Sequence, residues 1–177
     1  MEAMENILTR RSVRVYKDQP VSREMLDTVL AAAQMAPTWK NTQTPGYIVI
    51  TTPEKKAELM EALPAYNARN VSTAPVVVVM TTKKKRCAYE RDGSFTTKKE
   101  DRWEMFDAGI ACQTLCLAAW ANGLGTCIMG IYDEEKVPAL LEVPEDQYVT
   151  AIVSMGYPAE TPKAPKRKPL EEKIQYV

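Results

Sequence analysis

Three arginines and a serine stand within five residues near the start of the chain, in the run Arg10-Arg11-Ser12-Val13-Arg14. A guanidinium donates hydrogen bonds in a fixed fork that matches phosphate oxygens, and the serine adds a hydroxyl donor. The cluster therefore predicts a phosphate site. The alternative is a solvated basic end of the preceding helix, where the helix dipole favours positive charge.

A second candidate site is a loop that combines amides, hydroxyls and one indole, Pro37-Thr38-Trp39-Lys40-Asn41-Thr42-Gln43-Thr44-Pro45. Such groups can hydrogen-bond the edge of a heteroaromatic ring and place an aromatic wall beside it. Ordinary turn chemistry accounts for the same residues equally well. Residues 83–102 carry many charges of both signs and predict a mobile surface segment. Its basic side chains are either solvated or meet a cofactor phosphate or a substrate.

The sequence contains no histidine, which excludes Ser-His-Asp and Cys-His catalysis and the H-E-x-x-H zinc site. Its four cysteines, at positions 87, 112, 116 and 127, form no C-x-x-C pair and predict buried reduced thiols, with no metal site. Cys112 and Cys116 share one helix face, so a metal or redox pair is the alternative. An enzyme of this composition would take its chemistry from a cofactor.

With 177 residues, of which 45% are hydrophobic, the chain is long enough for one core and predicts a single domain over residues 1–177. The formal net charge is zero and the isoelectric point is about 6.4, which gives no reason to expect a nucleic acid or an anionic membrane as partner. The N-terminal stretch is acidic where a signal peptide is basic. We therefore expect an unprocessed cytoplasmic protein.

The element that must position these residues is a long helix, predicted from Arg102 to Asn122. From Ala108 to Ala121 it is apolar or small on nearly every side, which predicts a helix enclosed by protein. The apolar run of about 14 residues is too short for a membrane span, which needs about 20. Gly123 ends the helix, and a short strand follows at 126–129.

The other apolar patterns predict three further strands and several shorter helices. The strand over 74–80 is apolar throughout, so we expect it to be central and buried on both faces. Ser22 is the predicted N-cap of the second helix, and Asp133 that of the last. The predicted ranges are 2–9, 22–36, 53–63 and 133–141 for helices, 47–51 and 148–157 for the other strands, and 158–169 for an extended proline-rich arm.

Taken together and in order, six of these motifs resemble the FMN-dependent nitroreductase-like flavoproteins. The resemblance implies an α+β fold with a small, mainly antiparallel sheet flanked by helices. It also implies an obligate homodimer with two FMN sites at the interface, in which the arm, residues 158–177, wraps the partner. The motifs are RRSVR at 10–14, APTWKNTQ at 36–43, DAG at 107–109, GLGTC at 123–127 with Gly130, MGYP at 155–158 and RKPLEE at 167–172.

The same resemblance implies roles for individual residues. Arg10 and Ser12 would face the ribityl phosphate of FMN, assisted by Arg11 and joined by Arg167. Arg14 would lie near the pyrimidine edge of the flavin. The loop would contact the flavin through Pro37, Thr38, Trp39 and Asn41, in part from the partner subunit. Met129 and Gly130 would present a backbone N–H to flavin N5.

The expected reaction is hydride transfer from NADH or NADPH to flavin N5, followed by reduction of a small electron-poor acceptor such as a nitroaromatic or a quinone. No side-chain base is required, which agrees with the absence of histidine. Another flavin reaction on the same fold, such as reductive dehalogenation or flavin breakdown, is the main alternative. A non-enzymatic binding module with a basic patch is the second.

Overall fold

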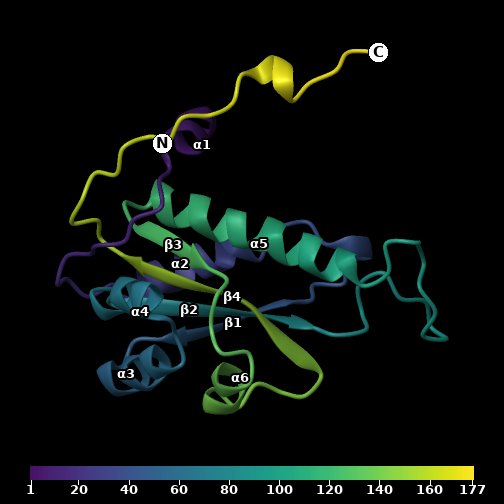
Figure 1. The fold of residues 1–177 in the computed structure, drawn as a ribbon, viewed down its shortest axis with the longest axis horizontal. Coiled ribbons are helices and arrows are strands. Elements are labelled where there is room, and N and C mark those ends of the chain that lie inside the picture. Colours follow the sequence, from purple (N-terminus) through teal and green to yellow (C-terminus); the bar gives the residue numbers. More distant parts are fainter.

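The computed structural model describes residues 1–177 as one antiparallel four-stranded sheet with helices on both faces (Figure 1). The spatial strand order is β1-β2-β4-β3, which confirms the predicted α+β class. The strands are β1 (Pro45–Ile50), β2 (Val76–Lys83), β3 (Gly125–Met129) and β4 (Gln147–Gly156). Because β1 and β3 form the edges, the apolar strand β2 lies inside the sheet.

The central position of β2 explains its continuous apolar sequence. Val76, Val78 and Met80 pack with the helices α2 (Arg23–Ala33) and α5 (Arg102–Ala121) on one face. Val77 and Val79 belong to the core on the other face, beneath α3 (Pro53–Glu61), α4 (Ala65–Ser72) and α6 (Lys136–Leu140). Successive side chains of a strand point to opposite faces, so both sets are buried. The predicted two-sided burial is confirmed.

Helix α5 has almost the predicted bounds, but one of its sides is uncovered in the single chain. Leu115 is fully buried against the sheet, whereas Met105 is 52% and Phe106 57% exposed. Within the apolar stretch from Ala108 to Ala121, Gly109, Gln113 and Ala121 are exposed, because a small sheet covers only one side of a helix. The enclosure of this helix by a second copy of the chain stays a prediction. No helix of the chain is long and apolar enough to cross a membrane.

The N-terminal segment joins the sheet beyond its β3 edge. After α1 (Ala3–Thr9), Ser12 forms a parallel bridge with Thr126, and the Val13 amide donates to the Thr126 carbonyl over 2.9 Å. Further along, Tyr16 bridges Pro158 in the antiparallel sense. The segment that carries the arginines is thus fixed by backbone hydrogen bonds to strand β3 and to the residues after β4.

One of the two predicted N-caps is confirmed, and one helix was missed. Ser22 Oγ accepts from the Met25 amide over 3.2 Å. The prediction that Asp133 caps the last helix is wrong, because α6 begins at Lys136 with Glu135 at its N-cap, although Asp133 Oδ1 accepts from the Lys136 amide over 2.9 Å. The start of α3 at Thr52 carries no side-chain cap, and Pro53 occupies the first turn. The sequence predicted no helix at α4, whose only buried residues are Asn67 and Val71.

The segment between β2 and α5 is more buried than its charged composition predicted. Cys87 and Ala88 within it are fully buried, which corrects the prediction of a purely surface segment. An isolated bridge pairs Tyr89 with Phe95, and their ring centroids lie 4.7 Å apart. The other three cysteines are also buried, and all four are free, as predicted.

After Pro158 the chain leaves the body of the molecule, and Figure 1 shows it extending past α1 to the C-terminus. It contains only the short 3-10 turn Leu170–Glu172. Its apolar side chains are exposed, among them Leu170 at 63% and Tyr176 at 90%. The arm is therefore extended as predicted, and its apolar groups find no core within the chain.

Candidate active site

A cavity of about 290 Å³ gathers the residues predicted to bind phosphate. Four arginines and one lysine line it, together with one serine and two prolines. None of these five cations forms an ion pair with a carboxylate. Uncompensated guanidinium groups that converge on one space favour a bound anion. The lining residues are Arg10, Arg11, Ser12, Arg14, Pro162, Lys163, Pro165 and Arg167.

Hydrogen bonds and buried side chains hold the arginine segment in place. Val13 and Tyr16 are buried, whereas Ser12 and Arg14, on either side of Val13, line the cavity. The Tyr16 hydroxyl donates to the Val13 carbonyl over 2.6 Å and lies 2.8 Å from Ser154 Oγ. Burial raises the pKa of Tyr16 far above its usual value, so the phenol stays neutral and keeps this bond.

A larger cavity, of about 500 Å³, adjoins the arginine cluster, and Arg14 lines both. It lies between the missed helix α4 and the exposed edge of β3. Polar side chains of α4 form one wall, while Cys127 and Ile128 of β3 form another. The contributing α4 residues are Tyr66, Asn67, Arg69 and Asn70, with Thr73 at the end of the helix.

Sequence reasoning missed this wall, although the sequence held a signal for it. Positions 66, 69, 70 and 73 recur at helical spacing and are all polar or aromatic, which places them on one side of a helix. In the structure, Asn67 Nδ2 donates to the Ile131 carbonyl over 2.8 Å and ties α4 to the loop after β3. Asn70 Nδ2 lies 4.0 Å from Cys127 Sγ and 3.9 Å from Met129 Sδ.

Met129 and Gly130, predicted at flavin N5, line neither cavity. The Met129 side chain is buried in the core beneath α3, α4 and α6, whereas Gly130 is exposed just after β3. No atom lies within 4 Å of a Cβ built on Gly130. The structure thus leaves the backbone at the end of β3 accessible, and the role of these two residues stays a prediction.

The predicted loop is anchored to α5 by its tryptophan. The Trp39 amide donates to Asp107 Oδ2 over 2.8 Å, and the Trp39 ring lies 4.8 Å from the ring of Trp103. The backbone is unfavourable here, because Lys40 and Gln43 have φ angles of 45° and 51°. For residues with side chains this region costs about 1–3 kcal/mol each. The loop therefore needs these contacts to keep its shape.

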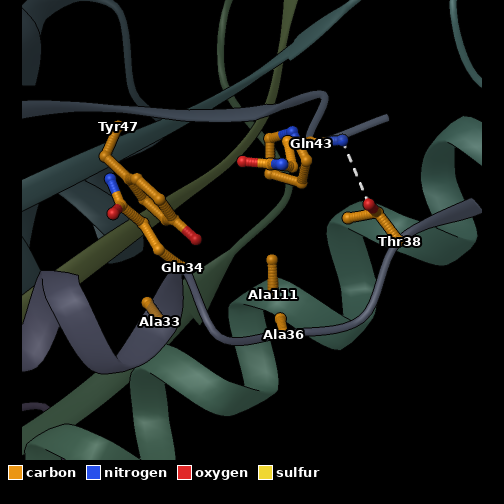
Figure 2. A pocket seen from close by; sticks show the side chains of 8 residues that line it. Ala33, Gln34, Ala36, Thr38, Gln43, Tyr47 and Ala111 are labelled. Carbon is orange, nitrogen blue, oxygen red and sulfur yellow. Dashed lines mark hydrogen bonds between the residues drawn. The ribbon is translucent and has the colours of Figure 1, made fainter. Parts of the chain in front are cut away.

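Behind the same loop lies a small cavity of about 150 Å³ (Figure 2). Three alanines, Ala33, Ala36 and Ala111, form its apolar side, and the amides of Gln34 and Gln43 and the ring of Tyr47 line the remainder. The backbone N–H of Gln43 donates to Thr38 Oγ1 over 3.0 Å. Of the four loop residues expected to contact the flavin, Thr38 lines this cavity, whereas Pro37, Trp39 and Asn41 do not.

The loop and the arginine cluster lie toward opposite ends of α5. The loop contacts Asp107, whereas Trp120 Nε1 donates to Thr9 Oγ1, directly before Arg10. At 1.5 Å per residue, the 13 residues from Asp107 to Trp120 span about 20 Å. A single chain therefore does not bring the two predicted halves of the site together. The chain also contains no group of three or more side chains suited to hold a metal ion.

The chain matches the model of the nitroreductase family over residues 7–65 and 61–157. It is 32% identical to a candidate NADH dehydrogenase/NAD(P)H nitroreductase of Archaeoglobus fulgidus, with 90% of this chain and 87% of the relative covered. It is also 32% identical to an FMN reductase (NADPH) of Bacillus subtilis, over 93% of this chain and 70% of the relative.

A similar solved structure is that of an FMN-dependent nitroreductase from Clostridium difficile R20291. It has a TM-score of 0.79 and 29% identity, and the match covers 98% of both chains. The family model spans all four strands and all the helices that border the cavities. On the family match and on the identity to the two relatives, the chain belongs to the nitroreductase family.

Proposed function

We propose that this protein is an NAD(P)H-dependent oxidoreductase that binds FMN and reduces a small electron-poor acceptor. The observation that carries the proposal is the cavity in which Arg10, Arg11, Ser12, Arg14 and Arg167 meet without carboxylate partners. A dianionic ribityl phosphate matches this charge. The FMN and NAD(P)H named in the descriptions of relatives support the same cofactor and donor.

The flavin ring would occupy the larger neighbouring cavity, because Arg14 lines both spaces. A ring placed there lies along the edge of β3, beside Cys127 and Ile128 and close to the accessible backbone of Gly130. Along the strand, Thr126 and Gly130 are about 13 Å apart at 3.3 Å per residue. One elongated ligand could thus place its phosphate at Ser12 and its ring edge near Gly130.

The loop 37–45 would complete the site from a second copy of the chain. Within one chain the loop lies about 20 Å along α5 from the arginine segment. The uncovered side of α5, with Met105 and Phe106, and the exposed apolar residues of the C-terminal arm supply surfaces for a homodimer. In such a dimer, Pro37, Thr38, Trp39 and Asn41 of the partner would contact the flavin.

When bound, FMN would supply the redox chemistry by accepting hydride from the nicotinamide donor and passing electrons to the acceptor. The chain's own side chains would bind and orient the ligands. Arg10, Ser12 and Arg167 would hold the phosphate, and the Arg14 guanidinium would favour negative charge at the nearby edge of the ring. No residue needs to act as an acid or base through an imidazole, since the chain has no histidine.

The test begins with the purified protein, which should be yellow and release FMN on heating, at about one per chain. Anaerobic titration with NADH and with NADPH should bleach the flavin band. Product assays with a nitrofuran, a quinone and a halotyrosine then separate the nitroreductase reaction from dehalogenation. A protein that holds FAD, or that binds no flavin after reconstitution, would refute the proposal.

A further inference from the structure

A single carboxylate oxygen joins three separate segments at the first turns of α5. Asp107 is 2% exposed, and its Oδ2 atom accepts from the Trp39 amide over 2.8 Å and from Cys87 Sγ over 3.2 Å. Trp39 belongs to the loop 37–45, and Cys87 belongs to the segment 83–102. Asp107 therefore connects the loop to a segment for which the sequence indicated no structural role.

The loop keeps a strained backbone, although its Asn41, Thr42 and Gln43 amides donate to Thr38 and Trp39 within the loop. Three of its residues that are not glycine, Lys40, Asn41 and Gln43, have positive φ angles. Four buried polar atoms in or next to it have no hydrogen-bond partner, whereas buried polar groups are nearly always bonded. These atoms are Trp39 Nε1, Thr42 Oγ1 and Thr44 Oγ1, together with Thr82 Oγ1 on the neighbouring strand. Contacts from outside the loop must offset the free-energy cost of this backbone and of these unbonded groups.

The segment 83–102 supplies the rest of the anchor. Burial raises the pKa of the Cys87 thiol to about 12, assisted by its hydrogen bond to Asp107, so Cys87 stays a neutral donor at physiological pH. Trp103, which packs against Trp39, donates through Nε1 to Thr97 Oγ1 over 3.0 Å. At the surface, Lys40 pairs with Glu90 over 3.4 Å. The segment thus contacts the loop directly through Glu90 and Lys40, and indirectly through Asp107 and Trp103 of α5.

We propose that Asp107 is a positioning residue that fixes the loop 37–45 through Oδ2 and fastens the segment 83–102 to it. The inference rests on the proposed function in one respect, namely that this loop contacts the bound flavin. The loop then presents the Trp39 region to the flavin in one conformation. Asp107 touches neither the flavin nor an acceptor and acts through Trp39.

Two substitutions separate the hydrogen bonds from the charge. In Asp107→Asn, the amide oxygen can take the place of Oδ2 and accept from both Trp39 and Cys87, so the loop should stay fixed. In Asp107→Leu, both bonds are lost, while the branched shape of the side chain is kept. Glu104→Gln is the matched control, since Glu104 is buried one turn earlier on the same helix and accepts from the Lys85 amide, not from the loop.

Hydrogen exchange of the Trp39 amide in the flavin-free protein measures positioning without any cofactor. Loss of a hydrogen bond to a charged group should accelerate this exchange about 10- to 100-fold in Asp107→Leu. The dissociation constant of FMN should rise by a similar factor, of about 10 or more, while the rate at saturating FMN changes less. Asp107→Asn and Glu104→Gln should stay within about 3-fold of the wild type in both measurements.

If Asp107→Leu fails to fold, Cys87→Ala and Cys87→Ser give the same test. The alanine variant should accelerate Trp39 amide exchange and the serine variant should restore it, because the hydroxyl keeps a donor to Asp107. Unchanged exchange at Trp39 in Asp107→Leu, or in Cys87→Ala, would overturn the inference. So would equal effects of Asp107→Leu and Glu104→Gln. A wild type that binds no FMN refutes the proposed function instead, while the exchange experiment still decides on Asp107.

Discussion

Val13 fills the space in front of Gly125 so closely that a Cβ atom on the glycine would lie 2.6 Å from Val13 Cγ2. Only glycine at position 125 lets the arginine segment approach β3 closely enough for the Val13 amide to bond to Thr126. The distance between these two chains therefore determines where Ser12 and Arg14 stand. This contact couples the packing of the core to the geometry of the anion cavity.

The first prediction is that Gly125→Ala displaces the arginine segment. The added methyl group forces Val13 outward, which should lower the free energy of unfolding by about 1–3 kcal/mol and weaken FMN binding. Urea unfolding and FMN titration measure the two effects. The control is Gly109→Ala in the exposed middle of α5, where a Cβ meets nothing within 4 Å. It should gain about 0.5–1 kcal/mol, and equal destabilisation by both variants would contradict the close approach at Val13.

The second prediction concerns Arg10 in the phosphate cavity. Arg10→Ala removes one or two charge-assisted hydrogen bonds, worth about 2–4 kcal/mol in total, and should weaken FMN binding about 30- to 1000-fold. Fluorescence titration of the apoprotein with FMN gives the dissociation constant. Arg23→Ala is the control, because Arg23 is an exposed arginine of α2 that pairs only with Asp27. Unchanged affinity of Arg10→Ala would assign Arg10 to the solvated surface.

A third prediction follows from Glu104, whose pKa burial raises, although hydrogen bonds from the Lys85 amide and the Tyr148 hydroxyl oppose the shift. Between the unfolded and folded pKa values, the folded state holds a proton that the unfolded state releases. Its contribution to stability is therefore fully present below the unfolded pKa and is lost as the pH rises through the folded pKa. Glutamine keeps the hydrogen bonds and does not titrate.

Unfolding of the wild type and of Glu104→Gln should accordingly be compared from about pH 4 to about pH 7. The variant should become the more stable of the two as the pH rises, by at most about 1.4 kcal/mol per pH unit. The exposed carboxylate of Glu61, at the end of α3, provides the control Glu61→Gln, for which no such trend is expected. A constant difference between wild type and Glu104→Gln across this range would argue against a raised pKa.

The parts of the fold that could be predicted are those whose pattern is local. The apolar runs of β2 and α5 predicted the type of each element and its bounds to within a few residues. A strand buried on both faces and a long, mostly apolar helix both appear in the sequence as continuous apolar runs. Helix α4 left almost none, since its buried side has only Asn67 and Val71 and its other side is polar. The role of its polar side as a cavity wall follows only from the tertiary structure, which places β3 beside it.

The resemblance of the motifs predicted which basic residues of the candidate site lie together. Arg10, Arg11, Ser12, Arg14 and Arg167 do line one cavity, although more than 150 positions separate the two segments, as the sequence numbering shows. Their meeting depends on the Ser12–Thr126 and Tyr16–Pro158 bridges, which no local pattern encodes. The bond of Cys87 to Asp107 depends in the same way on tertiary packing, and the sequence therefore did not predict it.

The last prediction is that the folded unit is a homodimer held in part by the C-terminal arm. Truncation after Tyr157 removes Arg167 from the anion cavity and also removes the exposed apolar groups of Leu170, Ile174 and Tyr176. Exposed apolar side chains without a local core favour burial against another chain. The truncated protein should therefore lose both dimer stability and flavin, as measured by light scattering and by absorbance.

Two further variants separate these effects. Truncation after Lys168 keeps Arg167 but removes the apolar end of the arm, so it should weaken the dimer. Arg167→Ala in the full chain should leave the dimer intact and weaken FMN binding about 10- to 100-fold, as loss of a charge-assisted bond does. Because the loop 37–45 is about 20 Å along α5 from the arginines of its own chain, a weaker dimer should also release flavin. A stable monomer that retains FMN, or a chain ending at Tyr157 that still dimerises and stays yellow, would show that one copy suffices for the site.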